Sequence, residues 1–319
     1  LPPYAPVSEL QEKYGSPNPK GLMEYISTCK REFKPQTKFQ YSCLNYITLQ
    51  HIIETITGQS LRDFAKENIF DILGMQYTDY LPTIQQQDGK WINTVACPWM
   101  DRIAPTEKQK DGSVLCGQVH DPLARILNGG ISGNAGIFSN ANDIGILAAA
   151  LLNGGEYNGR RILSPLGVKT MCTVPRELTA FGRTPGWDIF SPYASNKGDL
   201  FSPNTFGHTG YTGTSIIIDP DNDTAVILLV NAVHPEDRHS IVRLRLPSTI
   251  LKLAYKLKGV EHTCLVTDAL SYAAAEGKAI DDPRIIIEDG VCKLADRSAL
   301  AGSIATMDQL VRTMVKADI

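Results

Sequence analysis

The sequence lacks the patterns that mark membrane, nucleic-acid-binding and metal-dependent proteins. None of its apolar runs approaches the roughly 18 residues that a membrane span requires. Its formal net charge of −3 gives no basic surface for nucleic acid. The six histidines form no His-Glu-x-x-His pattern, and the seven cysteines form no Cys-x-x-Cys pair. We therefore expect no metal or other cofactor, no membrane span and no nucleic-acid partner, which leaves a small molecule or a protein.

Targeting and nucleotide-binding signals are also missing. The chain begins Leu1-Pro2-Pro3-Tyr4, without an initiator methionine or a signal segment, so we expect it to be internal to a longer protein. Scattered cysteines favour a reducing compartment, but the absent signal region leaves the cell envelope and the cytoplasm both open. The glycines between 129 and 136 satisfy neither G-x-G-x-x-G nor G-x-x-x-x-G-K-[ST] and indicate a tight turn instead of a phosphate loop.

The sequence has the composition and the helical spacing of an ordinary globular protein. Hydrophobic residues make up 43% and charged residues 20%. Apolar residues recur at helical spacing from Tyr46 to Ile56, and Gly58 then ends the predicted helix. Three more helices are predicted: one from a capping box at Ser60 to Gly74, one from about Asn142 to Gly154, and one that starts at Ser164-Pro165.

A β-hairpin follows these helices. Two β-branched runs, Ile216–Asp219 and Thr224–Val230, flank the turn-forming cluster Pro220–Asp223. Helices that precede an antiparallel hairpin argue for an α+β fold. The stretch just before the hairpin reads FGHTGYTGT, and its three glycines would let another chain or a ligand approach the strand backbone closely.

This stretch resembles the third active-site motif of the serine β-lactamase and penicillin-binding-protein superfamily, in the esterase-like branch where His-Thr-Gly replaces Lys-Thr-Gly. The segment around Tyr41-Ser42-Cys43 is similar to the family's Tyr-x-Asn motif. Further matching segments occur in the expected order: Ile69–Met75, Ala104–Glu107, Val119–Asp121 and Gly130–Ser139. The resemblance covers residues 1–245 and implies a β-lactamase/transpeptidase-like antiparallel sheet flanked by helices, here truncated at its start.

The resemblance also implies roles for individual residues. Tyr41 would be the general base or proton relay, and nearby cations would have to lower a phenol pKa that is ordinarily near 10. His208 would be the second catalytic residue. Cys43 and the run Thr209-Gly210-Tyr211 would line the substrate and oxyanion region, with the Tyr211 N–H as one oxyanion donor.

Two departures from the family pattern affect the expected substrate. His208 stands where many relatives have lysine, and a histidine with an ordinary pKa of about 6.5 is mostly neutral at pH 7. Cys43 stands in place of an asparagine and removes an amide that would orient a substrate amide. Both changes favour cleavage of esters or D-amino-acid peptides over β-lactam hydrolysis.

The nucleophile of the family's Ser-x-x-Lys motif is missing from its expected place. The one such spacing, Ser27 to Lys30, lies much closer to Tyr41 than in relatives. We interpret Ser27 as an exposed helix residue and expect the attacking serine outside this sequence, which would leave the fragment inactive. The neighbouring pair His120-Asp121 is expected to stabilise a loop and not to act as a catalytic pair.

Residues 247–319 resemble the end of N-acetylglucosamine-6-phosphate deacetylase, an amidohydrolase with a β/α-barrel. The segments LVTDA, EDGV and LAGSIATMDQLVR carry this resemblance, and Arg284–Leu294 is a predicted hairpin through Asp289-Gly290. Asp268 matches the catalytic acid/base of that family. Because the other barrel strands and the metal ligands are absent, Asp268 is expected to be vestigial, without activity.

The sequence thus predicts two parts: a serine-hydrolase domain, 1–245, and a partial barrel fragment, 247–319, joined by truncation or artefact. The predicted function is a serine hydrolase that acts on ester or D-amino-acid peptide substrates through an acyl-enzyme. A cell-wall-peptide binding module without catalysis and part of an amino-sugar deacetylase are the alternatives. An activated-ester assay distinguishes a hydrolase from a binder.

Overall fold

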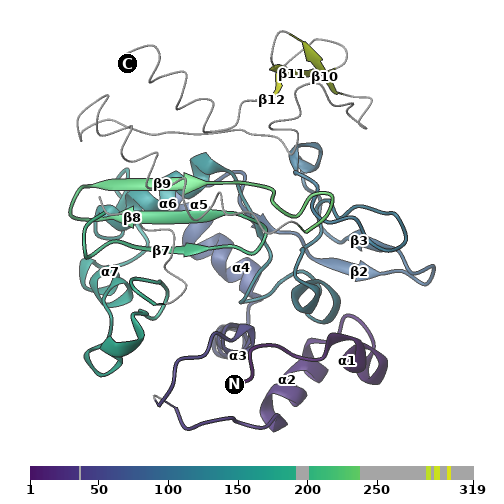
Figure 1. Cartoon of the computed structure of the whole chain (residues 1–319), viewed down its shortest axis with the longest axis horizontal. Coiled ribbons are helices and arrows are strands. Elements are labelled where there is room, and N and C mark those ends of the chain that lie inside the picture. The colour runs from purple at the N-terminus through teal and green to yellow at the C-terminus, as the bar shows by residue number, and fades with distance from the viewer. Residues whose placement is uncertain (36, 192–200, 238–284, 289–290, 295–299, 303–319) are drawn as a thin grey trace. The chain divides into compact units, whose positions relative to one another are not determined.

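A computed structural model describes residues 1–35, 37–191, 201–237, 285–288, 291–294 and 300–302 (Figure 1). The chain forms two compact units, Leu1–Val168 and Lys169–Ile319, which are described separately below. Among the described residues, no helix is both long and apolar enough to cross a membrane.

The first unit begins with three helices: α1 (Val7–Tyr14), α2 (Pro19–Thr28) and α3 (Cys43–Thr57). The Asn18 side chain accepts a hydrogen bond from the Gly21 N–H and caps α2, and a proline occupies the first turn of this helix. Helix α3 ends at Gly58, whose left-handed conformation (φ 70°) agrees with the predicted glycine stop. Helix α1 was not predicted from its spacing.

The remaining helices of this unit follow the predicted order. Ser60 accepts a hydrogen bond from the Asp63 N–H and starts α4 (Leu61–Ala65), which continues through a π-helical segment (Lys66–Phe70) into α5 (Asp71–Leu73). The other helical elements are α6 (Ala141–Leu152), the 3-10 segment Met100–Arg102 and the π-helical segment Leu123–Leu127. The strands of this unit form short antiparallel pairs. These pairs are β1 (Asp79–Tyr80) with β4 (Ile137–Phe138), β2 (Thr83–Gln85) with β3 (Trp91–Asn93), and β5 (Glu156–Tyr157) with β6 (Arg160–Arg161). Helix α7 (Pro165–Cys172) contains the boundary between the units.

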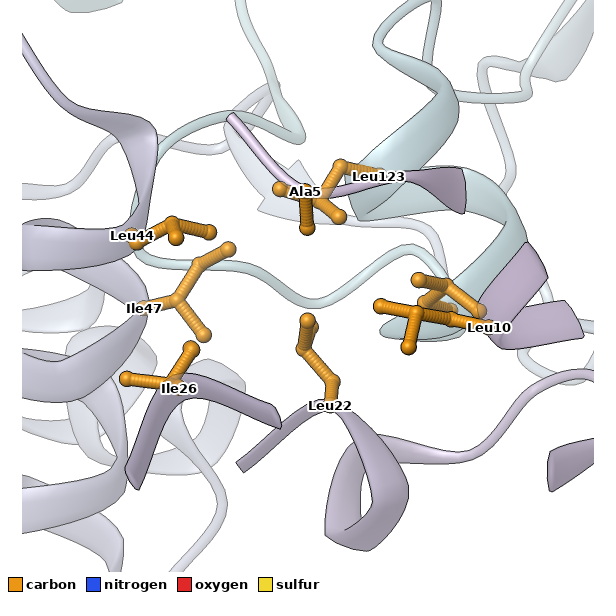
Figure 2. Close-up of a cluster of buried hydrophobic side chains, with 8 residues drawn as sticks. Ala5, Leu10, Leu22, Ile26, Leu44, Ile47 and Leu123 are labelled. Carbon is orange, nitrogen blue, oxygen red and sulfur yellow. The ribbon is translucent and has the colours of Figure 1, made fainter. Parts of the chain in front are cut away.

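Two apolar clusters form the core of the first unit. One joins α1, α2, α3 and the π-helical segment near residue 125, and Figure 2 shows its aliphatic side chains pointing toward one another from these elements. Its buried members are Ala5, Leu10, Leu22, Ile26, Leu44, Ile47, Leu123 and Leu127. The second cluster joins α4 and the segments after it to α6, with Leu61, Ala65, Phe70, Leu73, Met75, Tyr80 and Ala150 buried. The first cluster holds the start of α3 in place.

The second unit contains an antiparallel sheet of β7 (Phe206–Thr209), β8 (Ser215–Asp219) and β9 (Thr224–Leu228), which lie side by side in Figure 1. The predicted hairpin is confirmed, because β8 and β9 pair from Ser215 with Leu228 to Asp219 with Thr224. Before the sheet, a 3-10 segment spans Arg176–Phe181. Strands β10 (Ile285–Glu288), β11 (Val291–Leu294) and β12 (Leu300–Gly302) form a separate antiparallel sheet, so the strands of the second predicted hairpin are also present.

Several predictions lie outside the described residues. They include the seam at 246–247, the LVTDA segment with Asp268, and the turn at 289–290. The proposed domains 1–245 and 247–319 therefore stay predictions.

Candidate functional site

The first group of predicted site residues lies where α3 begins. Ser42 is the N-terminal flanking residue of α3 and is buried, and its hydroxyl donates to the Pro2 carbonyl instead of capping the helix. The next N–H, of Cys43, donates to the Pro3 carbonyl over 3.0 Å. The start of the chain thus fixes the backbone of the motif, and the half-buried Tyr41 directly precedes this anchored turn.

A buried polar network ties the segment Gly130–Ser139 to α3. The amide of Gln50, on α3, donates to the Ile131 carbonyl over 3.1 Å, and its oxygen accepts from the Gly133 N–H over 3.0 Å. The Asn128 amide donates to both Gln50 and Ser132, and the Ser132 hydroxyl donates to the Asn134 side-chain oxygen over 2.7 Å. The polar groups of this network serve as hydrogen-bond partners for one another, so the network favours one packing of the Gly130–Ser139 segment against α3.

Gly133 is required for this close approach. An added Cβ would lie 2.0 Å from the Tyr46 carbonyl oxygen and 2.7 Å from its carbon. Glycine therefore serves here for helix–loop contact, in addition to the turn geometry that the sequence indicated. The result is that Asn134 is held beside the first turn of α3.

The Cys43 thiol lies in a largely apolar setting with one amide partner. Burial, followed by the negative charge of Asp121, raises its pKa, while a hydrogen bond with the Asn134 side chain lowers it and only partly compensates. The thiol is thus protonated at neutral pH and is a poor nucleophile. Asn134 brings an amide next to the position where the sequence had lost one, although no role was predicted for this residue.

The loop that carries Asp121 is braced from several directions. One carboxylate oxygen accepts from the Ala124 N–H over 2.8 Å, and the other accepts from the Tyr4 hydroxyl over 3.1 Å. The buried Arg125 guanidinium donates to the Val119 and His120 carbonyls. His120 Nε2 lies 3.2 Å from a Glu107 carboxylate oxygen. The pair His120-Asp121 therefore stabilises the loop, as its sequence context indicated.

Ser27 has the surroundings of a surface residue. It is exposed near the end of α2, and its hydroxyl donates to the Glu24 carbonyl over 2.7 Å. Lys30 comes after the helix ends at Thr28, and the intervening Cys29 is extended. The two side chains are thus not one helical turn apart, which the Ser-x-x-Lys arrangement requires.

The second group of predicted site residues lies on β7 in the second unit. His208 pairs with Ile216 of β8. On the other side of β7, Gly207 exchanges two backbone hydrogen bonds with Asp188, at 2.9 and 3.0 Å. An added Cβ at Gly207 would meet the Ile216 carbonyl oxygen at 2.3 Å. The close approach to the strand backbone that Gly207 predicted is therefore made by Asp188 and Ile216 of this same chain.

The imidazole of His208 is half-buried between backbone and an arginine. Its Nδ1 lies 2.9 Å from the Thr209 carbonyl oxygen, and its Nε2 lies 3.1 Å from Nη2 of Arg183. Arg183 also donates to the Asp188 carboxylate over 3.2 Å. Burial, and then the charge of Arg183, lowers the pKa of His208 below its usual value. The neutral histidine that the sequence predicted is thus favoured further by its surroundings.

The turn after β7 holds the rest of this group. The Gly210 N–H donates to the Thr214 carbonyl over 2.7 Å and the Gly213 N–H donates to Gly210 over 3.1 Å. The Tyr211 side chain is 62% exposed, and its hydroxyl donates to the Asp237 carboxylate.

At the far end of β8, the buried Asp219 accepts from the Ser202 N–H and hydroxyl.

The sequence-predicted residues therefore fall into two groups. Tyr41 and Cys43 belong to the first unit, and His208, Thr209, Gly210 and Tyr211 belong to the second. Asp268 lies outside the described residues. Two further polar residues contact predicted site residues: Asn134, which lies in the family-like segment Gly130–Ser139 but had been given no role, and Arg183, which lies in none of the motifs named above. Among the described residues, no three His, Cys, Asp or Glu side chains gather as metal ligands do.

Comparisons with known proteins match most of the chain. An Escherichia coli K12 protein named "Putative D-alanyl-D-alanine carboxypeptidase" is 35% identical over 226 residues, which are 66% of this chain and 49% of that protein. A Salmonella gallinarum protein of the same name is 32% identical over 246 residues, which are 73% of this chain and 54% of that protein. The chain thus spans about half the length of these curated relatives.

Solved structures show the same fold. The structure titled "EstCE1, a hydrolase with promiscuous acyltransferase activity" aligns with a TM-score of 0.50 and 18% identity, over 78% of this chain and 67% of that one. The Beta-lactamase family matches residues 1–247. The comparisons do not show the amidohydrolase fragment. Over residues 1–247, this chain belongs to the Beta-lactamase family.

Proposed function

We propose that this chain contributes the Tyr41 motif and the His208-Thr209-Gly210 motif to a serine hydrolase that cleaves esters or D-amino-acid peptides through an acyl-enzyme. The observation that carries the proposal is a family match over 1–247 in which His208 and Thr209 end the strand β7 and Gly210 begins the turn after it. In this proposal Tyr41 accepts or relays the serine proton, and backbone N–H groups near Tyr211 stabilise the oxyanion. The attacking serine is supplied from outside these 319 residues.

The proposed substrate class combines two lines of support. The names of the curated relatives favour peptides that end in D-alanine. The surroundings of His208 disfavour its charged form, so this position offers no lysine-like cation to a substrate carboxylate. Substrates without a free carboxylate, such as simple esters, should therefore be cleaved at least as readily as peptides with one.

The test uses the complete protein that contains this chain, with an activated acetate ester and an acetylated peptide ending in D-alanyl-D-alanine as substrates. We expect an acyl-enzyme burst, and a Tyr41→Phe substitution should reduce kcat by about 10²- to 10⁴-fold. Tyr25→Phe on α2 is the matched control and should retain the parental rate. Absence of turnover with both substrates, together with saturable peptide binding, would replace the hydrolase by the cell-wall-peptide binding module.

For residues 247–319, the likeness to an amino-sugar deacetylase stays a proposal about sequence relationship alone. Asp268 is proposed to be vestigial. Release of acetate from N-acetylglucosamine 6-phosphate by this chain, in a zinc-dependent manner, would contradict that assignment.

A further inference from the structure

The hydrogen bonds of His208 define where its ring carries a proton. A guanidinium has five N–H donors and no acceptor. Since Nη2 of Arg183 lies 3.1 Å from Nε2 of His208, the imidazole nitrogen must be the acceptor in this contact. The single proton of a neutral ring then sits on Nδ1, which lies 2.9 Å from the Thr209 carbonyl oxygen and donates to it. Both ring nitrogens thus have complementary partners in one neutral tautomer.

Arg183 is itself held firmly in the position that this contact needs. Arg183 and Asp188 form a β-bridge across a short turn, and their side chains form an ion pair at 3.2 Å with only 12% and 6% exposed. Within the turn, the Thr184 hydroxyl accepts from the Trp187 N–H over 2.7 Å, and the Trp187 ring contacts Phe206 of β7 at 5.3 Å between centroids. The turn that carries the guanidinium is therefore attached to the strand that carries the imidazole.

The backbone strengthens the same attachment. Asp188 and Gly207 exchange two hydrogen bonds, one residue before His208. Asp188 also accepts from the Ser191 N–H over 3.2 Å with its other carboxylate oxygen. One aspartate thereby orients the arginine through its side chain and fixes β7 through its main chain.

We propose that Arg183 is a positioning residue for His208, whose guanidinium holds the imidazole as the neutral tautomer protonated on Nδ1. A proton on Nε2 would place two donors against each other at 3.1 Å. An imidazolium would in addition stand beside a fixed positive charge. The charged side chains that act on His208 among the described residues are Arg183, which disfavours protonation, and Asp188, which favours it more weakly.

This assignment deepens the proposed function, on which its catalytic meaning rests. His208 would serve neither as a cation for substrate nor as a proton donor through Nε2. Its contribution is to hold the Thr209 carbonyl, and with it the end of β7, in one orientation. The cation next to the His-Thr-Gly motif is Arg183, which is neutralised by Asp188.

Long-range ¹H–¹⁵N NMR correlation of the 319-residue chain tests the tautomer without any turnover. The signals of His208 are assigned by their loss in His208→Gln. At pH 7 we expect Nδ1 to be protonated and Nε2 to be unprotonated, and the ring to remain neutral as the pH falls through about 6.5, the ordinary histidine value. A wild-type ring protonated on Nε2, or on both nitrogens, overturns the proposal.

Substitutions then test the role of the arginine. Arg183→Met should give His208 a measurable population protonated on Nε2 and a higher titration midpoint, whereas Arg183→Lys, which keeps a donor and a charge, should restore part of the wild-type pattern. Arg176→Met, at an exposed arginine of the same unit, is the control and should change neither property. An unchanged tautomer and midpoint in Arg183→Met would contradict the proposal. If that variant fails to fold, the wild-type and lysine spectra still decide. None of these outcomes depends on whether the complete protein is a hydrolase.

Discussion

Replacing Gly133 by alanine tests whether contact between α3 and the Gly130–Ser139 segment positions Asn134 beside Cys43. The new Cβ would lie 2.0 Å from the Tyr46 carbonyl oxygen, which is helix backbone and cannot rotate away. Overpacking of this kind costs about 1–3 kcal/mol. Displacement of the segment also threatens the 3.0 Å hydrogen bond from the Gly133 N–H to Gln50, worth about 1 kcal/mol. We therefore expect a total loss of about 2–4 kcal/mol.

Urea unfolding monitored by circular dichroism measures this loss, and thermal unfolding should show a decrease in Tm of roughly 5–15 °C. A second readout is the alkylation rate of Cys43, followed by peptide mass spectrometry. This rate should fall as Asn134 moves away, because loss of its hydrogen bond raises the pKa of the thiol further and leaves less thiolate to react. Gly186→Ala is the matched control, because the nearest atom to its new Cβ is the Met171 Cγ at an ordinary 3.6 Å. A Gly133→Ala variant within about 0.5 kcal/mol of the parent, with unchanged alkylation, would refute the reasoning.

Four further predictions address the cores, the second unit and the nucleophile. Leu44→Ala should lower the free energy of unfolding by about 2–5 kcal/mol in urea titrations, because Leu44 is fully buried in the cluster of Figure 2. Asp219→Ala should lower the free energy of unfolding by about 2–4 kcal/mol. Burial raises the pKa of Asp219, but its hydrogen bonds outweigh burial and the pKa is lowered. The stability that the Asp219 carboxylate contributes should therefore be lost as pH falls below about 3.9. The lowered pKa of His208 predicts linkage of the same sign at higher pH: the unfolded chain takes up a proton first, so stability should fall below about pH 6.5, and Arg183→Met should reduce this fall in pH-dependent melting curves. Ser27→Ala should change stability by less than about 0.5 kcal/mol and leave ester hydrolysis by the complete protein unchanged.

Local features of the fold were predictable because each depends on adjacent residues. Gly58 and Gly74 end helices in left-handed conformations that favour glycine. The cluster Pro220–Asp223 forms the turn between β8 and β9, where Asp223 has a positive φ of 47°. Turn and cap chemistry is local, so the sequence alone indicated these positions.

The contacts of the candidate site were not predictable in the same way. Asn134 reaches the start of α3 through a network in which Gln50 bonds to Ile131, 81 residues away. Arg183 meets His208 across 25 residues of chain. Asn134 lies in a family-like segment and Arg183 in none, but for both residues only the folded arrangement assigns a partner. The glycines at 207, 210 and 213 were expected to let another chain or a ligand approach the strand, and at Gly207 the backbone of Asp188 lies along that edge.

Labelling by a fluorophosphonate probe, read by intact-mass spectrometry, tests the central claim most directly. The claim is that these 319 residues hold the Tyr41 and His-Thr-Gly motifs of a serine hydrolase while the attacking serine lies elsewhere. The account predicts no labelling of this chain and one probe per molecule on the complete protein, at a serine outside Leu1–Ile319. Stoichiometric labelling of any side chain within the 319 residues would contradict it.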